Sequence, residues 1–94
     1  MDKPWSLYII RCGTGALYTG ISTDVSRRFN EHQTSGKLAS RFLRGKGPLE
    51  LMFACPVGDR SQATRLERRV KVLSRDVKEA LISGKVTLDT LFTP

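Results

Sequence analysis

Four side chains that can bind anions or transfer protons are regularly spaced near the start of the sequence. Tyr8 and Tyr18 are ten residues apart, and Arg28 follows after ten more. His32 comes four residues later, one helical turn from Arg28 if this stretch is helical. A phenol or an imidazole can exchange a proton, and a guanidinium is a forked donor suited to phosphate or carboxylate. Together these groups could hold an anion and move a proton beside it.

An isolated carboxylate lies further along the chain. Glu67 is the only acid between Asp59 and Asp76. The basic residues around it are Arg60, Arg65, Arg68, Arg69, Lys71 and Arg75. A lone carboxylate among cations would suit a hard divalent metal ion bound together with a phosphate. The alternative is an ordinary surface pair with Lys71, worth about 0.3–0.5 kcal/mol.

The segment 36–48 is basic and rich in glycine. It contains Lys37, Arg41, Arg44 and Lys46, one aromatic residue, Phe42, and no acid. Glycines let a backbone come close to phosphates, and lysine and arginine bind them. The predicted nucleic-acid contacts are Gly20, Lys37, Arg41, Arg44, Lys46 and Lys71. A solvated basic loop without a specific partner is the alternative.

Ordinary structural explanations exist for the other candidates as well. Tyr8 and Tyr18 could be half-buried strand residues with solvated hydroxyl groups. Arg28 and His32 could lie on a solvated helix flank beside the buried stripe of that helix. Only their common arrangement, and not any one of them, favours a binding site.

Composition narrows the class of partner. The 94 residues fit a single domain spanning 1–94, and the formal net charge is +7 with a pI near 10.0. Such a chain attracts polyanions, but charge alone does not choose among DNA, RNA and membrane phosphates. The first residues do not resemble a secretion signal, and no apolar run approaches the ~18 residues of a membrane span. We therefore expect a cytoplasmic protein with no membrane association, in which Cys12 and Cys55 stay reduced.

The first half of the chain predicts a hairpin followed by a helix. The residues Trp5–Arg11 are aromatic and β-branched, which favours a strand, and Ala16–Ile21 form the returning strand after the glycines of 13–15. Tyr8, Tyr18 and Gly20 would share one face, and Gly20 indicates that another group comes close to the backbone there. Asp24 would cap a helix through Gln33, with Gly36 as its stop.

The second half predicts a strand and two helices. In the strand 48–56, the alternating Leu49, Leu51, Phe53 and Cys55 are expected to share one face. Asp59 or Ser61 would cap a helix with an apolar stripe of Ala63, Leu66, Val70 and Leu73. A shorter helix would bury Val77, Ala80 and Leu81, and the last ten residues give no clear pattern. The order β-β-α-β-α-α predicts an α+β fold, a small three-stranded antiparallel sheet packed with helices.

The candidate residues, in this order and spacing, resemble the GIY-YIG endonuclease family. The tripeptide "SLY" at 6–8 stands where the family has GIY, and "YTG" at 18–20 stands where it has YIG. The other matching positions are Arg28, His32 and Glu67. Ser6 departs from the first glycine of the motif. The similarity covers about residues 5–82, leaving 85–94 as a tail, and is greatest to the stand-alone YhbQ-like proteins.

This resemblance implies a nuclease that hydrolyses DNA phosphodiester bonds with a divalent metal ion, Mg²⁺ or Mn²⁺, bound by Glu67. Arg28 would stabilise charge on the phosphate, and Tyr18, or alternatively Tyr8, would accept the proton of the attacking water. His32 would orient the phenol or the phosphate. Family analogy adds branched or damaged DNA, and a role in repair or recombination. A chain without a second, base-reading module should have low sequence specificity.

Two other classes of function stay open. The chain could be a nucleic-acid-binding module that has kept the scaffold with little or no catalysis. It could also be an accessory protein whose basic face binds an acidic partner, although the sequence indicates no obligate protein partner.

Overall fold

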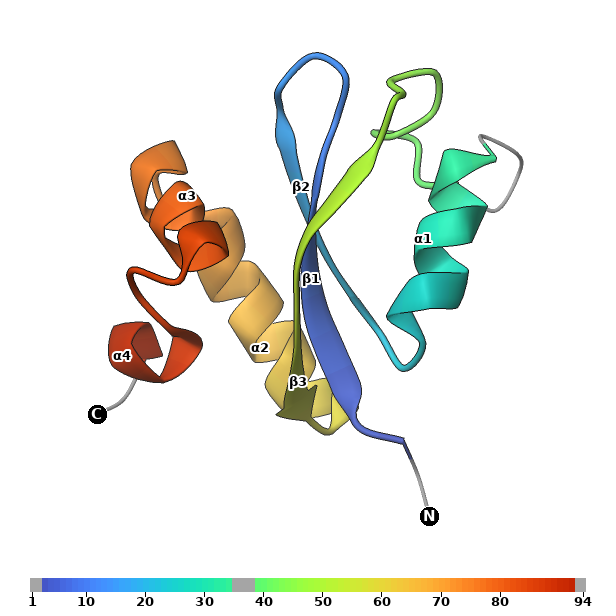
Figure 1. Ribbon diagram of the computed structural model, residues 1–94. Helices are drawn as coiled ribbons and strands as arrows, with labels where there is room; N and C mark the ends of the chain where they lie inside the picture. Colours follow the sequence, from blue (N-terminus) through green and yellow to red (C-terminus); the bar gives the residue numbers. More distant parts are fainter. Residues whose placement is uncertain (1–2, 35–38, 93–94) are drawn as a thin grey trace.

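The computed structural model describes residues 3–34 and 39–92 (Figure 1). The strands are β1 (Trp5–Arg11), β2 (Leu17–Ser22) and β3 (Glu50–Gly58). The helices are α1 (Val25–Gln33), α2 (Arg60–Lys71), α3 (Arg75–Ser83) and α4 (Leu88–Phe92). The predicted order of elements is confirmed, with α4 as an addition in the stretch that had no clear pattern.

The strands form one antiparallel sheet in the order β2-β1-β3. The α+β fold predicted from the sequence is therefore confirmed. β1 is central because its apolar residues are buried on both faces: Leu7, Tyr8, Ile9 and Ile10 are each at most 1% exposed. A strand that is hydrophobic on both sides must be covered on both sides.

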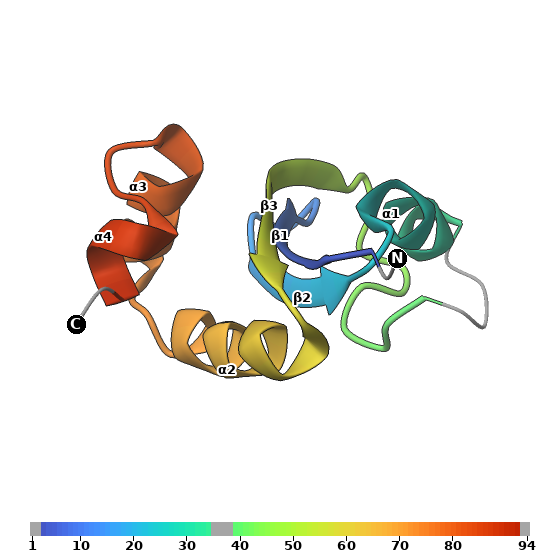
Figure 2. The ribbon, with the colours of Figure 1, turned by 90° about the horizontal axis from the view of Figure 1, so that it is seen from below.

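The two faces of the sheet carry separate apolar clusters. Leu7 and Ile9 pack with residues of α2, α3 and α4, including Val70, Leu81 and Leu88. On the other face, the main cluster comprises Tyr8, Ile10, Cys12, Leu43 and Leu49, with Val25 and Phe29 of α1 packed against it. Figures 1 and 2 show this division, with α1 on one side of the sheet and α3 and α4 on the other.

The prediction that Leu49, Leu51, Phe53 and Cys55 share one face of β3 is wrong. Along β1, Ile9 pairs with Phe53 but Ile10 pairs with Leu51, so the register shifts at Met52. Such a bulge places the residues before and after it on different faces. As a result, Leu49 packs in the Tyr8 cluster while Phe53 packs on the opposite side, and Leu51 is 39% exposed.

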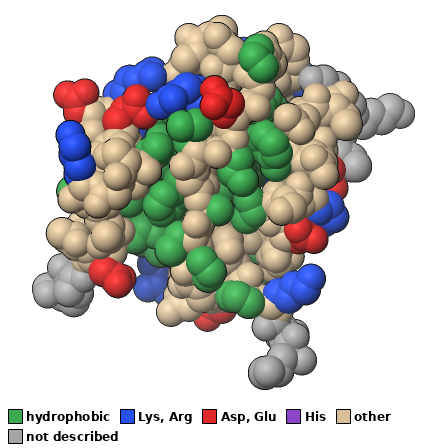
Figure 3. All heavy atoms as spheres, in the orientation of Figure 1, with side chains coloured by type: hydrophobic (Ala, Val, Ile, Leu, Met, Phe, Trp, Pro, Cys, Tyr) green, Lys and Arg blue, Asp and Glu red, His purple; other side chains and the backbone are tan. Residues whose placement is uncertain are grey.

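The front of the molecule in Figure 3 carries many hydrophobic side chains along and beside β3. This strand is an edge of the sheet, and several of its apolar residues, among them Phe53 and Val57, are only partly buried. Charged side chains lie mainly around the border of this view.

The helix caps follow the expected chemistry. The carboxylate of Asp24 accepts a hydrogen bond from the Arg27 amide at the start of α1, and Asp59 forms a capping box with Gln62 at the start of α2. The C-cap of α1 is Thr34, whereas the predicted stop at Gly36 lies outside the described residues. α3 ends at Gly84, whose φ of 83° is the left-handed conformation that glycine adopts easily.

Both cysteines are unpaired thiols, as predicted: Cys12 is buried and Cys55 is half-buried. Within 3–34 and 39–92, no helix has the length and apolar character needed to cross a membrane.

Gly20 is opposite Tyr8 across the β1–β2 ladder, and its lack of a side chain makes room for the tyrosine ring. A Cβ atom added at Gly20 would overlap with Oη and Cζ of Tyr8. The close approach predicted for Gly20 is confirmed, and the approaching group is the Tyr8 phenol. A contact of Gly20 with nucleic acid stays a prediction. Gly20 therefore fixes where the Tyr8 hydroxyl lies.

We expect Gly20→Ala to lower the free energy of unfolding by about 1–3 kcal/mol, because the added methyl group overpacks the Tyr8 site. Urea denaturation followed by circular dichroism measures this cost. In a Tyr8→Ala background the same methyl group has room, so its cost should fall to less than half. An equal cost in both backgrounds would show that the Tyr8 ring is not the cause.

Candidate active site

The predicted pair of tyrosines meets on the face of the sheet that α1 covers. The ring centroids of Tyr8 and Tyr18 are 6.3 Å apart. His32 joins them from α1, with its ring centroid 6.2 Å from that of Tyr8 and 5.6 Å from that of Tyr18. The predicted proximity of the two phenols is thus confirmed, and an imidazole completes a cluster of three rings.

His32 is fully buried, so the alternative of a solvated helix flank does not apply to it. Its Nε2 lies 3.0 Å from Oη of Tyr8. Its Nδ1 accepts a hydrogen bond of 3.2 Å from the backbone N–H of Ser40. Since an N–H cannot donate to a protonated nitrogen, the neutral ring carries its proton on Nε2 and donates it to Tyr8 Oη. His32 therefore acts as a fixed donor to this phenol.

Burial controls the ionisation of this pair. It lowers the pKa of His32, and the nearby Arg28 charge lowers it further, against the opposing effect of Glu31. Burial also raises the pKa of Tyr8, and the charge of Tyr18 adds to that rise. Arg28 opposes the rise in the Tyr8 pKa through its charge and a hydrogen bond, without overcoming it. Both members of the pair are thus neutral near pH 7.

Arg28 connects the ring cluster to solvent. Its side chain is 29% exposed, and Nη1 donates a 2.8 Å hydrogen bond to Oε1 of Glu31. The other carboxylate oxygen of Glu31 accepts a 2.8 Å hydrogen bond from Arg27. Arg28 also interacts electrostatically with Tyr8 and Tyr18. This guanidinium is held beside both phenols with part of its surface open to an incoming anion.

Glu67 lies on α2, a helix that packs against β1 and β2. Its charge acts on Tyr8, where it raises the pKa of the phenol, although less than burial does. Its side chain is only 20% exposed, and Oε2 lies 3.5 Å from Nζ of Lys71. Glu67 therefore forms the ordinary helix pair and, at the same time, lies within electrostatic reach of the buried tyrosine.

The donor set around Glu67 fits one kind of metal ion. Throughout the described ranges, no three His, Cys, Asp or Glu residues are grouped so that they could hold a metal ion. Mg²⁺ needs no such group, because it commonly takes one or two carboxylates and completes its shell with water and substrate phosphate. A single, partly exposed carboxylate fits that pattern and does not fit a closed protein cage.

The basic segment lies next to the ring cluster. Its described part forms a turn over Arg41–Gly45, in which Arg41 and Arg44 are exposed. Phe42 stacks on Tyr18, with ring centroids 5.8 Å apart and an interplanar angle of 25°. The Lys46 ammonium lies 4.0 Å from the centroid of the Phe42 ring. Lys37, also predicted to contact nucleic acid, lies outside the described residues.

Comparison with known proteins agrees with this geometry. Residues 4–80 match the family model described as the GIY-YIG catalytic domain. The chain belongs to the GIY-YIG family. The resemblance inferred from the spacing of Tyr8, Tyr18, Arg28, His32 and Glu67 is thereby confirmed.

Several relatives of this GIY-YIG chain carry the name UPF0213. One from Pectobacterium carotovorum is 62% identical over 81 residues, which is 86% of this chain and 80% of that protein. The UPF0213 protein YhbQ of Salmonella typhimurium is 51% identical over 90 residues, 96% of this chain and 88% of that one. A solution NMR structure of the UPF0213 protein BH0048 from Bacillus halodurans is 38% identical, with a TM-score of 0.54, covering 86% of this chain and 84% of that one. These names state no activity.

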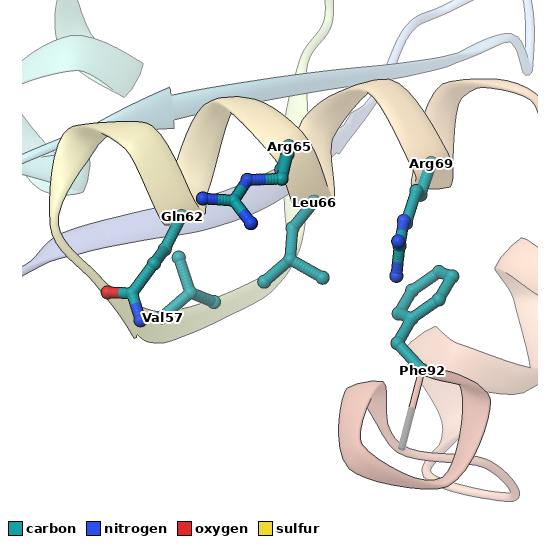
Figure 4. A pocket seen from close by; sticks show the side chains of 6 residues that line it. All are labelled: Val57, Gln62, Arg65, Leu66, Arg69 and Phe92. Carbon is teal, nitrogen blue, oxygen red and sulfur yellow. The ribbon is translucent and has the colours of Figure 1, made fainter. Parts of the chain in front are cut away.

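Two features of the structure were not predicted, one beside the ring cluster and one away from it. The sequence predicts Phe42 only as a member of a basic segment. The signal that could have indicated its contact with the site is that it is the one aromatic residue of that segment, among glycines and cations. The arginines of α2 were considered only as surroundings of Glu67. Arg65 and Arg69 line a hollow of about 230 Å³ together with Val57, Gln62, Leu66 and Phe92 (Figure 4).

This hollow is separate from the ring cluster of the GIY-YIG domain. Val57, Leu66 and Phe92 belong to the apolar cluster on the Leu7 face, opposite the face that carries Tyr8 and Tyr18. The guanidinium of Arg69 lies over the Phe92 ring, 5.7 Å from its centroid, and Figure 4 shows the two side by side. The hollow is therefore bordered by two cations of α2, Arg65 and Arg69, and is not part of the candidate active site.

Acidification should destabilise the protein through His32, its only histidine. Because the folded state lowers the pKa of this residue below 6.5, the unfolded chain binds a proton that the folded chain resists. The stabilising contribution of neutral His32 is therefore complete above about pH 6.5 and is lost as the pH falls towards its folded-state pKa. Urea denaturation at a series of pH values from about 7.5 to 5.5 measures this loss. His32→Gln should reduce the slope over that range, and an unchanged slope would contradict the assignment.

Proposed function

We propose that this chain is a Mg²⁺-dependent nuclease that hydrolyses DNA phosphodiester bonds, with Mn²⁺ able to replace Mg²⁺. Membership of the GIY-YIG family supports a nuclease-type activity. The observation that carries the proposal is the position of Arg28, partly exposed and in electrostatic contact with both Tyr8 and Tyr18. A cation so placed can bind a phosphate directly beside groups that exchange protons.

Arg28 is proposed to stabilise negative charge on the scissile phosphate. Its guanidinium presents several donors in a fixed plane, which matches the geometry of phosphate oxygens. Glu31 holds it in position through the 2.8 Å hydrogen bond. One preorganised electrostatic contact of this kind is worth about 3–4 kcal/mol in the transition state.

Tyr18 is the better of the two candidates for the proton acceptor. Tyr8 is 1% exposed and its pKa is raised by burial, so a water molecule could not reach it easily and its phenolate is disfavoured. Tyr18 is half-buried and lies next to the cation Arg28. Tyr8 and His32 then have a positioning role, because their hydrogen bond fixes the rings against which Tyr18 packs.

Glu67 is the residue proposed to hold the metal ion, with substrate phosphate and water as its other ligands. When bound, the ion would supply Lewis-acid polarisation of the scissile phosphate and charge for the leaving oxygen. The Lys71 ammonium, 3.5 Å from the same carboxylate, is available for a neighbouring phosphate.

Binding to DNA is proposed to come mainly from exposed cations around this site. Arg41, Arg44, Lys46 and Lys71 would contact phosphates, and Lys37 belongs to the same segment of the sequence. These contacts carry no base information, so cleavage should have low sequence specificity. A nuclease selective for DNA structure and acting in cytoplasmic repair or recombination would fit these properties.

A second candidate is a nucleic-acid-binding module with little or no catalysis. It is favoured by the small donor set, since Glu67, whose charge acts on Tyr8, already pairs with Lys71. Both candidates predict binding that weakens with salt, so only a cleavage assay separates them.

We expect Glu67→Gln to reduce cleavage of labelled branched and linear DNA at least about 100-fold, because it removes the metal-binding carboxylate. Rates with Mg²⁺ and with a chelator measure the effect. Glu50→Gln is the matched control, since Glu50 is an exposed acid on β3. Equal cutting by Glu67→Gln and wild type would show a contaminant or another site. Binding without cutting by both proteins would favour the binding module.

Arg28→Ala should lower the cleavage rate about 100-fold or more while weakening DNA binding only a few-fold, because its main contact forms in the transition state. Single-turnover rates and fluorescence anisotropy measure the two effects separately. Arg75→Ala, which removes an exposed cation from α3, provides the control for net charge. A parallel loss of rate and affinity would instead make Arg28 a simple binding residue.

A further inference from the structure

Phe42 is an exposed aromatic residue directly beside the candidate active site. Phe42 is 40% exposed, whereas most large hydrophobic residues in the described parts of the chain are covered. Its ring stacks on Tyr18, the proposed proton acceptor. An aromatic ring left partly uncovered at this place offers a surface for stacking.

The ring is carried by a turn that is fixed at several points. The Ser40 amide donates to His32, and the Phe42 amide donates a 3.2 Å hydrogen bond to the Ser40 hydroxyl oxygen. Leu43 is fully buried in the Tyr8 cluster. The carbonyl of Lys46 accepts a 2.8 Å hydrogen bond from the Gly13 amide in the turn between β1 and β2. The position of Phe42 is thus determined by the same contacts that build the site.

A cation accompanies the ring. The Lys46 ammonium lies 4.0 Å from the Phe42 centroid, on a long side chain that can move to a nearby phosphate. A ring for stacking and an ammonium group a few ångströms away match the base and the phosphate of one nucleotide. Proteins that bind single strands combine aromatic platforms and basic side chains in this way.

We propose that Phe42 and Lys46 form a subsite for an unpaired nucleotide next to the bond that is cut. The base would stack on Phe42, and Lys46 would leave the ring to bind that nucleotide's phosphate. A base inside an intact duplex is covered by its neighbours on both faces, so only an unpaired base can occupy this subsite. The proposal rests on the proposed nuclease function and specifies its substrate class, DNA with a single-stranded segment such as a flap, gap or bulge.

Binding without cleavage tests the subsite. In the presence of a chelator, fluorescence anisotropy compares an oligothymidylate with an abasic oligomer of the same length and charge. Wild type should bind the oligomer with bases at least about fivefold more tightly. Phe42→Leu keeps an apolar cover over Tyr18 but removes the aromatic ring, so the two affinities should become equal. Equal affinities in the wild type, or the same preference in wild type and Phe42→Leu, would overturn the proposal.

Charge controls complete this experiment. Arg41→Gln should weaken binding of both oligomers equally, because Arg41 is an exposed cation of the same turn. Lys46→Gln should also lower the salt dependence of binding by about one phosphate contact. Phe42→Trp should keep the preference for bases, and its indole fluorescence should be quenched by oligothymidylate and not by the abasic oligomer. This variant tests stacking even if Phe42→Leu does not fold, and an absence of quenching would count against the subsite.

The outcome is separable from that of the nuclease proposal. If the protein cuts DNA in a Glu67-dependent manner but shows no preference for bases, the subsite is wrong and the nuclease stands. If the preference depends on Phe42 but no cleavage occurs, the subsite stands and the protein is a binding module.

Discussion

The hydrogen bond between Tyr8 and His32 is the interaction on which the site depends. It joins the central strand to α1, and the bond from the Ser40 amide to the other ring nitrogen extends the connection to the basic turn. Both side chains are almost completely buried, so each polar atom needs a partner to offset the loss of water. Across the described residues, every buried side-chain nitrogen and oxygen has such a partner. Three segments far apart in the sequence are thus held in one arrangement.

The same burial separates the site residues into two groups that differ in how easily they become charged. It disfavours the charged forms of Tyr8 and His32, which makes them suitable for holding a fixed geometry and unsuitable for exchanging protons with water. In the proposed mechanism the chemistry therefore belongs to groups that keep contact with solvent, namely Tyr18, Arg28 and Glu67. A rigid interior layer and a more exposed outer layer follow from one physical cause, the exclusion of water from the face that α1 covers.

Local patterns in the sequence were sufficient for most of the fold. Alternation along β1 and β2 placed both tyrosines on one face, and Asp24 marked the start of α1. The directions of the side chains along β3 were not predictable in this way. The bulge at Met52 reverses them, while the alternation of Leu49, Leu51, Phe53 and Cys55 in the sequence continues through the bulge unchanged. α4 was missed because a helix of five residues has too few turns to show a period.

The meeting of Tyr8, Tyr18 and His32 was predictable from the sequence, but the burial of His32 was not. Spacing identified His32, whereas its complete burial depends on the loop containing Ser40 and Leu43, which no helical pattern reveals. The carboxylates act locally, each on a cation within one turn of its own helix. Glu31 neutralises part of the charge of Arg28, and Glu67 does so for Lys71, so these cations already have internal partners. In the proposed function, phosphates would have to share or replace these partners, and the protein's own acids would hold the cations in position before the nucleic acid binds.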